Sequence, residues 1–289
     1  MANPRKSVIS KQLDSKVYKK KRLLKSHITL DNLIKKVLIM DLKENTILIT
    51  GGSTGIGLAL AKRFLDRDNT VIICGRRKDK LKKAKELCPK LHIKRCDVAD
   101  ESQRIALYHW AVKEFPGLNV LINNAGIQQR INLKDQKSDW AYCKQEIAIN
   151  LEAPIHLSKL FITHLMKQKK PVIMNVSSGL AFMPPAWVPV YGATKAGLHS
   201  FTFGMRVQLQ DVGIEVIEII PPAVDTDLGG VGLHTFGVPV DDFADEVFKG
   251  LENEDTEIGF GKEHLASTRL QREELERNAL KIWEQRKEG

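Results

Sequence analysis

The sequence is poor in features that mark several classes of protein. It has four cysteines, and no two of them form a C-x-x-C pair, so we expect no metal site. Cys74 and Cys96 lie in or beside apolar, strand-like runs, which favours buried free thiols and a reducing compartment, hence the cytoplasm. No apolar run reaches the roughly 20 residues that a membrane-spanning helix needs.

Acidic residues are scarce at the start of the chain. Residues 1–39 hold eleven lysines and arginines against two aspartates, Asp14 and Asp31, and so carry nine of the ten net positive charges of the protein. The remaining 250 residues are nearly neutral. The basic character therefore belongs to an N-terminal extension, and we expect no specific nucleic-acid partner for the body.

Three interpretations of residues 1–39 stay open. The segment is a tether to nucleic acid or to an anionic membrane, a helix that docks on a partner, or an upstream extension with Met40 as the native start. A membrane contact is expected only if the segment is native. An interfacial helix is indicated by apolar residues at helical spacing, with Lys35 and Lys36 between them: Leu30, Leu33, Ile34, Val37 and Leu38.

After Met40, apolar strand patterns alternate with helical patterns. We expect strands over 46–49, 70–74, 91–96, 119–123, 171–176, 215–220 and 257–260. We expect helices over 56–66, 78–87, 102–115, 146–167, 191–212 and 241–251. Continuous apolar strands between helices predict an α/β fold of the Rossmann type, a doubly wound parallel sheet covered on both faces. Such a sheet binds its ligand at the carboxyl ends of the strands.

The domain boundaries follow from this alternation. Residues 40–261 show no linker or internal repeat, so we expect a single domain there. Residues 262–289 are charged and predict a helical tail. Its apolar positions, which suggest packing on the body or on a second subunit, are Leu275, Ala279, Ile282 and Trp283.

A glycine-rich turn follows the first predicted strand and opens the first predicted helix: Thr50, Gly51, Gly52, Ser53, Thr54, Gly55, Ile56 and Gly57. In this context the glycines predict a cradle in which backbone N–H groups and the helix N-terminus bind a pyrophosphate. Gly51 permits the tight turn, Gly55 the approach of the phosphates, and Gly57 close packing of helix on sheet. The alternative is a tight strand–helix turn without a ligand.

The cofactor is predicted from the end of the second strand. An enzyme that uses NAD usually has an acidic residue there for the ribose 2′-hydroxyl. This chain has Gly75 followed by Arg76 and Arg77. A guanidinium can hold a 2′-phosphate through two hydrogen bonds, so we expect NADP, with Arg76 as the main contact. The alternative is a solvated basic start to the next helix.

The candidate reacting centre is Tyr191 with Lys195, four positions apart and therefore on one face of a helix. A nearby ammonium favours phenolate, so we expect Lys195 to lower the pKa of Tyr191 and to reach the cofactor ribose. Ser178 lies thirteen residues before Tyr191, where it can donate a hydrogen bond to a substrate oxygen. Ser177 stands beside it, so this assignment depends on spacing. Asn150 is expected to hold a water that links Lys195 to solvent.

These residues carry a resemblance to the short-chain dehydrogenase/reductase family, of the single-domain kind. The matching motifs are Thr50-Gly51-x-x-x-Gly55-x-Gly57, Asp97-Val98, Asn123-Asn124-Ala125-Gly126, Asn150, Ser178 and Tyr191-x-x-x-Lys195. Residues 71–77, 96–100, 178–182 and 221–226 are similar to the family's subgroup associated with the D-alanyl–lipoteichoic acid operon, a grouping that says little about the substrate.

The resemblance implies further roles. Ser178, Tyr191, Lys195 and Asn150 would form the catalytic set, Asp97 and Val98 would approach the adenine, and the 123–126 segment, with Asn124, Ala125 and Gly126, would lie beside the cofactor. It also implies a homodimer or tetramer that pairs through the helices of Asn150 and Tyr191. The family usually has Pro-Gly after the sixth strand, whereas here Pro221 precedes Pro222, so this loop must be shaped differently. Pro221, Val224 and Thr226 would still lie by the nicotinamide.

Together these features predict a carbonyl reductase that transfers hydride from NADPH to a small or medium apolar substrate. We expect the substrate pocket to be lined from 182–190 and 227–239, through Phe182, Met183, Trp187, Val188, Leu228 and Phe236. Two functions of other classes stay open. One is a low-turnover NADPH-binding sensor, and the other is a membrane-associated accessory protein tethered by residues 1–39.

Overall fold

The computed structural model describes residues 41–135, 140–183 and 185–260. The predicted extension 1–39 and helical tail 262–289 lie outside the described residues, so the expectations for them stay predictions.

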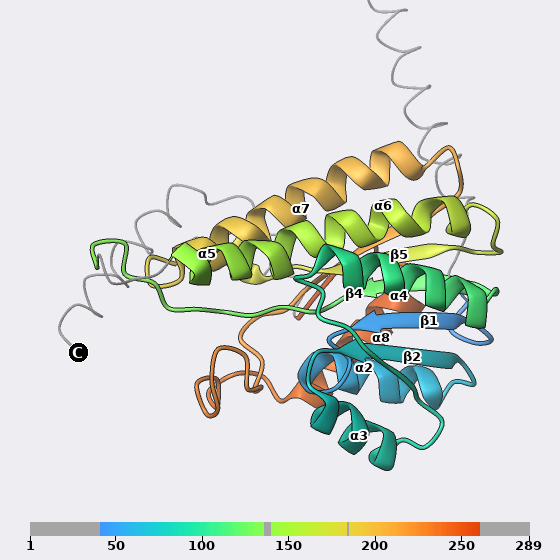
Figure 1. The fold of residues 1–289 in the computed structure, drawn as a ribbon, viewed down its shortest axis with the longest axis horizontal. Coiled ribbons are helices and arrows are strands. Elements are labelled where there is room, and N and C mark those ends of the chain that lie inside the picture. Colours follow the sequence, from blue (N-terminus) through green and yellow to red (C-terminus); the bar gives the residue numbers. More distant parts are fainter. Residues whose placement is uncertain (1–40, 136–139, 184, 261–289) are drawn as a thin grey trace, which may run out of the picture. The chain divides into compact units, whose positions relative to one another are not determined.

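Seven parallel strands form one sheet, in the order β3-β2-β1-β4-β5-β6-β7 (Figure 1). From β1 the chain adds β2 and β3 toward one edge of the sheet, and then crosses over to add β4 to β7 toward the other edge. The strand order therefore reverses between the neighbouring strands β1 and β4. Ligands bind in such folds at this switch point, outside the carboxyl ends of the strands. The strands are β1 (Thr46–Thr50), β2 (Thr70–Gly75), β3 (His92–Arg95), β4 (Leu118–Asn123), β5 (Val172–Val176), β6 (Glu215–Ile220) and β7 (Glu257–Gly259).

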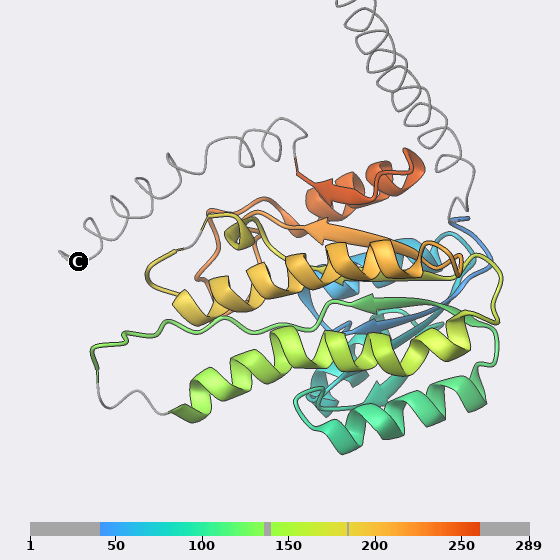
Figure 2. The same ribbon diagram turned by 90° about the horizontal axis from the view of Figure 1, so that it is seen from above.

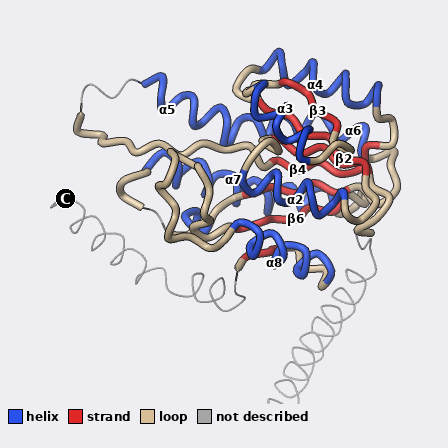
Figure 3. The backbone as a smooth tube through the Cα atoms, turned by 90° about the horizontal axis from the view of Figure 1, so that it is seen from below, coloured by secondary structure: helices blue, strands red, loops and turns tan. Residues whose placement is uncertain are grey.

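Helices cover both faces of the sheet, as Figure 3 shows with α4 and α6 on one side of the strands and α8 on the other. One face packs against α2 (Gly55–Leu65), α3 (Lys78–Leu87) and α8 (Val240–Glu252). The other packs against α4 (Glu101–Glu114), α6 (Ala153–Leu165) and α7 (Pro189–Leu209), which lie side by side in Figure 2.

Alternation along β1 explains the two cores. Ile47 and Ile49 point into the layer of α2 and α8, whereas Leu48 points into the layer of α4 and α6, and all three side chains are fully buried. A strand buried on both faces has no polar alternation. The continuous apolar runs of the sequence are therefore the correct signal, and the predicted doubly wound fold is confirmed.

The helix predicted over 146–167 differs from the structure. The described helix α5 runs over Trp140–Ile147, a π-helical turn, η1, follows over Ala148–Glu152, and α6 continues to Leu165. Pro154 explains the wide turn, because proline lacks the N–H that would bond to the carbonyl four residues earlier, that of Asn150. π-Turns of this kind are frequent at functional sites.

The other predicted elements agree with the structure to within three residues at each end. The short 3₁₀ turn η2 (Gly179–Ala181) follows β5 and was not predicted. Within the described part of the chain, every helix is too short or too polar to cross a lipid bilayer.

Candidate active site

A pocket of about 1240 Å³ opens at the carboxyl ends of the strands. It extends from the glycine turn after β1 to the loop 225–236 after β6. Of the residues predicted to bind a cofactor or to react, all line this pocket except Thr50 and Asn150, which lie behind its wall. The lining residues among them are Gly51, Ser53, Thr54, Gly55, Ile56, Gly57, Arg76, Arg77, Asp97, Val98, Asn124, Ala125, Gly126, Ser178, Tyr191, Lys195, Pro221, Val224 and Thr226.

The glycine turn fits closely against the segment after β4. Gly51 has φ +66°, a conformation that side chains rarely adopt. A Cβ on Gly57 would lie 2.4 Å from Asn124 Nδ2, so only glycine fits there. Thr50 Oγ1 accepts hydrogen bonds from the backbone N–H groups of Asn124 and Ala125, both at 3.0 Å. Thr50 therefore braces the turn from behind.

The N-terminus of α2 is suited to an anion. Thr54 stands at the cap position but makes no side-chain capping bond, so it leaves the first N–H groups of the helix without a side-chain acceptor. The Thr54 hydroxyl instead accepts a hydrogen bond from Arg77 Nη2 at 3.2 Å. Arg76 is exposed at the pocket rim, and its carbonyl accepts from Arg95 Nε at 3.4 Å. Two guanidinium groups thus stand beside the cradle.

Ser178 and Ser177 have different surroundings, which the sequence alone does not distinguish. Ser177 Oγ donates to the buried carboxylate of Glu218 at 2.5 Å, and His199 Nδ1 lies 2.8 Å from the same carboxylate. Ser178 Oγ accepts from Leu180 N at 3.1 Å, and its hydroxyl is near enough to the Tyr191 phenol to act on its pKa. Ser178 is therefore the serine that faces the tyrosine, as its spacing predicts.

Tyr191 and Lys195 are each 4% exposed and lie on one face of α7. Lys195 Nζ donates to the carbonyl of Val176 at 2.8 Å and lies 5.7 Å from the centre of the Tyr191 ring. Burial lowers the pKa of Lys195 to about 8, while Glu146 and Glu218 act to raise it.

The expected lowering of the Tyr191 pKa is wrong for this structure. Burial raises the pKa of Tyr191 to about 12, the hydrogen bond from Ser178 acts against that rise, and the charge of Glu146 adds to it. Removal of the phenol from water disfavours its charged form and outweighs its polar neighbours. Tyr191 is therefore held protonated at neutral pH.

Asn150 lies in the π-turn η1 and is 1% exposed. Its Oδ1 accepts from Ile127 N at 2.9 Å, and its Nδ2 donates to Ile127 O at 2.8 Å and to Thr194 Oγ1 at 3.3 Å. The side chain therefore ties the segment after β4 to α7. Its expected role in holding a water stays a prediction.

The substrate side of the pocket is less apolar than predicted. Phe182, Met183, Trp187, Leu228 and Phe236 line it as expected. Val188 does not, because its side chain is fully buried under the start of α7.

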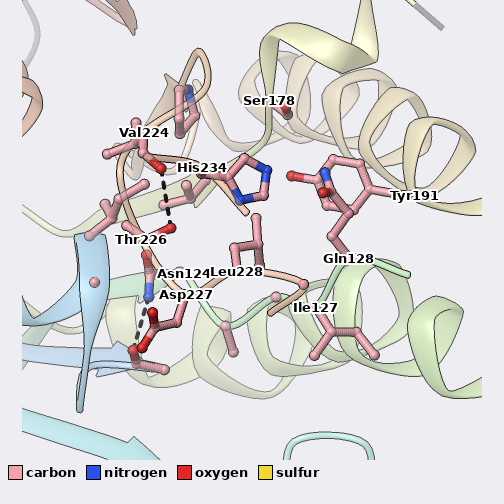
Figure 4. A pocket seen from close by; sticks show the side chains of 18 of the residues that line it. Asn124, Ile127, Gln128, Ser178, Tyr191, Val224, Thr226, Asp227, Leu228 and His234 are labelled. Atoms are coloured by element: carbon pink, nitrogen blue, oxygen red, sulfur yellow. Dashed lines mark hydrogen bonds between the residues drawn. The ribbon is translucent and has the colours of Figure 1, made fainter. Parts of the chain in front are cut away.

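Sequence reasoning missed the polar lining: Gln128, Gln129, Arg130, Gln145 and His234. Figure 4 shows the His234 imidazole facing the Tyr191 hydroxyl across the cavity. His234 Nδ1 is buried and has no hydrogen-bond partner among the described residues. No motif marks these residues, because four of them reach the pocket through two loops and Gln145 reaches it from α5.

The Pro221-Pro222 loop keeps its place beside the cradle. Pro221 O accepts from Gly179 N at 2.8 Å, and Val224 forms a parallel bridge with Val238. Thr226 Oγ1 donates to Val224 O at 3.3 Å, and a Cβ on Gly55 would lie 3.3 Å from Thr226 Cγ2. The second proline therefore does not prevent Thr226 from meeting the glycine turn.

Comparison with known proteins agrees with this geometry. The family model described as short chain dehydrogenase matches residues 45–231. The uncharacterized oxidoreductase DltE of Bacillus subtilis (strain 168) is 49% identical over 237 residues, which cover 80% of this chain and 91% of that protein.

Two solved structures are also similar. A short-chain dehydrogenase from Sphingobium yanoikuyae in complex with NADPH has a TM-score of 0.68 at 25% identity, covering 74% of this chain and 87% of that one. For a short-chain dehydrogenase/reductase from Burkholderia phymatum in complex with NAD, the TM-score is 0.73 at 19% identity, with 83% and 96% covered. The resemblance inferred from the motifs is confirmed, and the chain is an oxidoreductase that belongs to the short-chain dehydrogenase family.

Proposed function

We propose that the protein is a carbonyl reductase that uses NADPH. The observation that carries this proposal is the meeting of Ser178, Tyr191 and Lys195 at one end of a pocket whose other end is the glycine cradle. When bound, NADPH would supply the hydride. Its pyrophosphate would lie at the N-terminus of α2, where Thr54 leaves the first N–H groups of the helix without a side-chain acceptor.

The roles of the side chains follow from their protonation. Ser178 donates a hydrogen bond to the substrate oxygen and polarises the carbonyl. Tyr191, held neutral at physiological pH because its pKa is about 12, gives its proton to that oxygen as the alkoxide forms. The ammonium of Lys195 stabilises the resulting phenolate. A tyrosine that carries its proton at rest is suited to act as the acid in the reduction of a carbonyl.

The substrate class follows from both kinds of lining. Phe182, Met183 and Trp187 offer apolar contact to a small or medium carbonyl compound, while Gln128 and His234 offer hydrogen bonds near the reacting oxygen.

The surface of α5 and α7 supports pairing of subunits. Two large apolar side chains are exposed there, Trp140 on α5 and Phe203 on α7, and a second subunit that packed on these helices would cover them.

The function is tested on the purified full chain with a panel of ketones and aldehydes, by following the absorbance of NADPH. We expect turnover with at least one member. Binding of NADPH without turnover on any member would favour a sensor. If the full chain floats with anionic liposomes and a chain that starts at Met40 does not, a membrane accessory role is favoured.

The oligomeric state is tested by sedimentation of the same sample. A monomer would contradict the proposed pairing of subunits.

The two neighbouring serines allow a matched pair of substitutions. Ser178→Ala removes the proposed donor to the substrate oxygen, so we expect kcat/KM to fall about 100-fold, the usual size for loss of such a donor. Ser177→Ala instead removes a bond to Glu218, so we expect a lower Tm and a loss of activity below about tenfold. Kinetics and thermal melts of both variants check this, and equal kinetic losses would count against the assignment of Ser178.

A further inference from the structure

A buried carboxylate lies behind the proposed reacting centre and has no role in the mechanism above. Glu146 is fully buried on α5, one helical turn before Asn150. Its Oε1 accepts a hydrogen bond from Gln129 N at 2.9 Å. Its Oε2 is buried without a partner among the described residues. Burying a carboxylate oxygen without a hydrogen-bond donor costs folding free energy, and a nearby positive charge would offset that cost.

The geometry supplies that charge from α7. The ionisable groups that interact with Glu146 in the described structure are Lys195, whose ammonium attracts the carboxylate, and Tyr191, whose ionisation it opposes. A second buried carboxylate, Glu218, also acts on Lys195, but its oxygens are engaged by Ser177 and His199. Glu146 thus differs from Glu218 in having a free oxygen.

Glu146 and Asn150 also hold the same stretch of backbone. Separated by four residues on one helical run, they accept from the N–H groups of Gln129 and Ile127. The neighbouring Gly126 is close to the lysine, since a Cβ there would lie 3.7 Å from Lys195 Nζ and 3.5 Å from Asn150 Oδ1. The carboxylate and the amide therefore stand behind the same wall of the pocket that Lys195 lines.

We propose that Glu146 is a positioning residue, whose carboxylate keeps Lys195 protonated in its buried place and fixes the pocket wall at Gln129. This inference rests on the proposed function, because the charge on Lys195 matters there for stabilising the phenolate of Tyr191. Burial alone brings the pKa of Lys195 down toward neutrality, and Glu146 opposes that change. Without the carboxylate, Lys195 would lose its proton at a lower pH.

The test is Glu146→Gln, which removes the charge but keeps an oxygen to accept from Gln129. In wild type, kcat/KM should fall at alkaline pH as Lys195 loses its proton. In the variant we expect this fall to begin about one pH unit lower, because an opposite charge typically moves a pKa by that much or more. The loss of activity should then grow from less than about threefold at pH 6 to about fivefold at pH 8 and toward tenfold above about pH 9.

The control is Glu152→Gln, which removes the same charge from the same helical run. Glu152 is 55% exposed and pairs with Arg104 on α4, away from the pocket. Its pH profile should match that of wild type. An equal loss for Glu146→Gln at every pH would overturn the proposal, because it would indicate a purely structural role.

A second measurement does not depend on turnover. The folded-state pKa of Glu146 is raised, by burial first, to about 7 from 4.5, so its contribution to stability is present in full below pH 4.5 and is lost as pH rises through 7. The Tm of Glu146→Gln relative to wild type should therefore increase between pH 5 and pH 8. These thermal melts test the buried charge of Glu146 even if no carbonyl compound is reduced. A difference in Tm between variant and wild type that stays the same from pH 5 to pH 8 would overturn the proposal. Glu146→Leu replaces the glutamine variant if that one does not fold.

Discussion

Replacing Tyr191 with phenylalanine is expected to lower kcat/KM for carbonyl reduction by about 10³-fold, a size typical of losing a general acid. The substitution removes one hydroxyl from a residue that is 4% exposed and leaves the ring in place. The alkoxide that forms on hydride transfer then has no side-chain proton donor at the position of Tyr191. Ser178 can still polarise the carbonyl, so a residual rate is expected.

Steady-state kinetics on a substrate from the carbonyl panel measure this loss. NADPH binding, followed by the change in its fluorescence, should stay within a few-fold of wild type because the cradle is untouched. The matched control is Tyr108→Phe, since Tyr108 packs edge-on against Phe161 on α6 and does not line the pocket. Undiminished turnover in Tyr191→Phe would exclude the proposed proton donor.

The sequence predicts well the parts of the fold that are set by a short stretch of residues. Ile47, Leu48 and Ile49 form a continuous apolar run because both faces of β1 are covered. The glycine turn is recognisable because Gly51 requires positive φ and Gly57 has no room for a Cβ. Spacing alone places Tyr191 and Lys195 on one helical face.

Features that depend on tertiary contacts were predicted poorly. The π-turn at Asn150 was missed for a different reason, because Pro154 in a helical run predicts a break or kink but not which wide turn replaces it. The pKa of Tyr191 rises because burial outweighs its neighbours, and burial has no sequence motif. His234 and Gln128 line the same pocket as Tyr191 only because two loops converge on it. Glu146 was missed for the same reason, as helix periodicity gives no sign of which charged side chain faces inward.

The similar structures do not decide between NADP and NAD as the cofactor, since one of them holds NADPH and another holds NAD. Here β2 ends at Gly75, and Arg76 and Arg77 follow at the pocket rim. Arg77 donates to Thr54, so part of its hydrogen-bonding capacity is engaged, whereas the exposed Arg76 side chain can turn to a 2′-phosphate. We therefore expect wild type to prefer NADPH over NADH in kcat/KM.

Arg76→Asp should reverse this preference. The substitution removes a charge-assisted hydrogen-bond donor, worth about 1.5–3 kcal/mol, and places a carboxylate where it repels a 2′-phosphate but can accept from a ribose hydroxyl. The ratio of kcat/KM for NADPH to that for NADH should fall by about 10- to 150-fold from the lost donor alone. Lys78→Asp makes the same charge change two residues on, at an exposed position that does not line the pocket, and should alter the ratio far less. Equal shifts in both variants would mean that overall charge, rather than a contact from Arg76, sets the preference, and a wild type that favours NADH would refute the assignment.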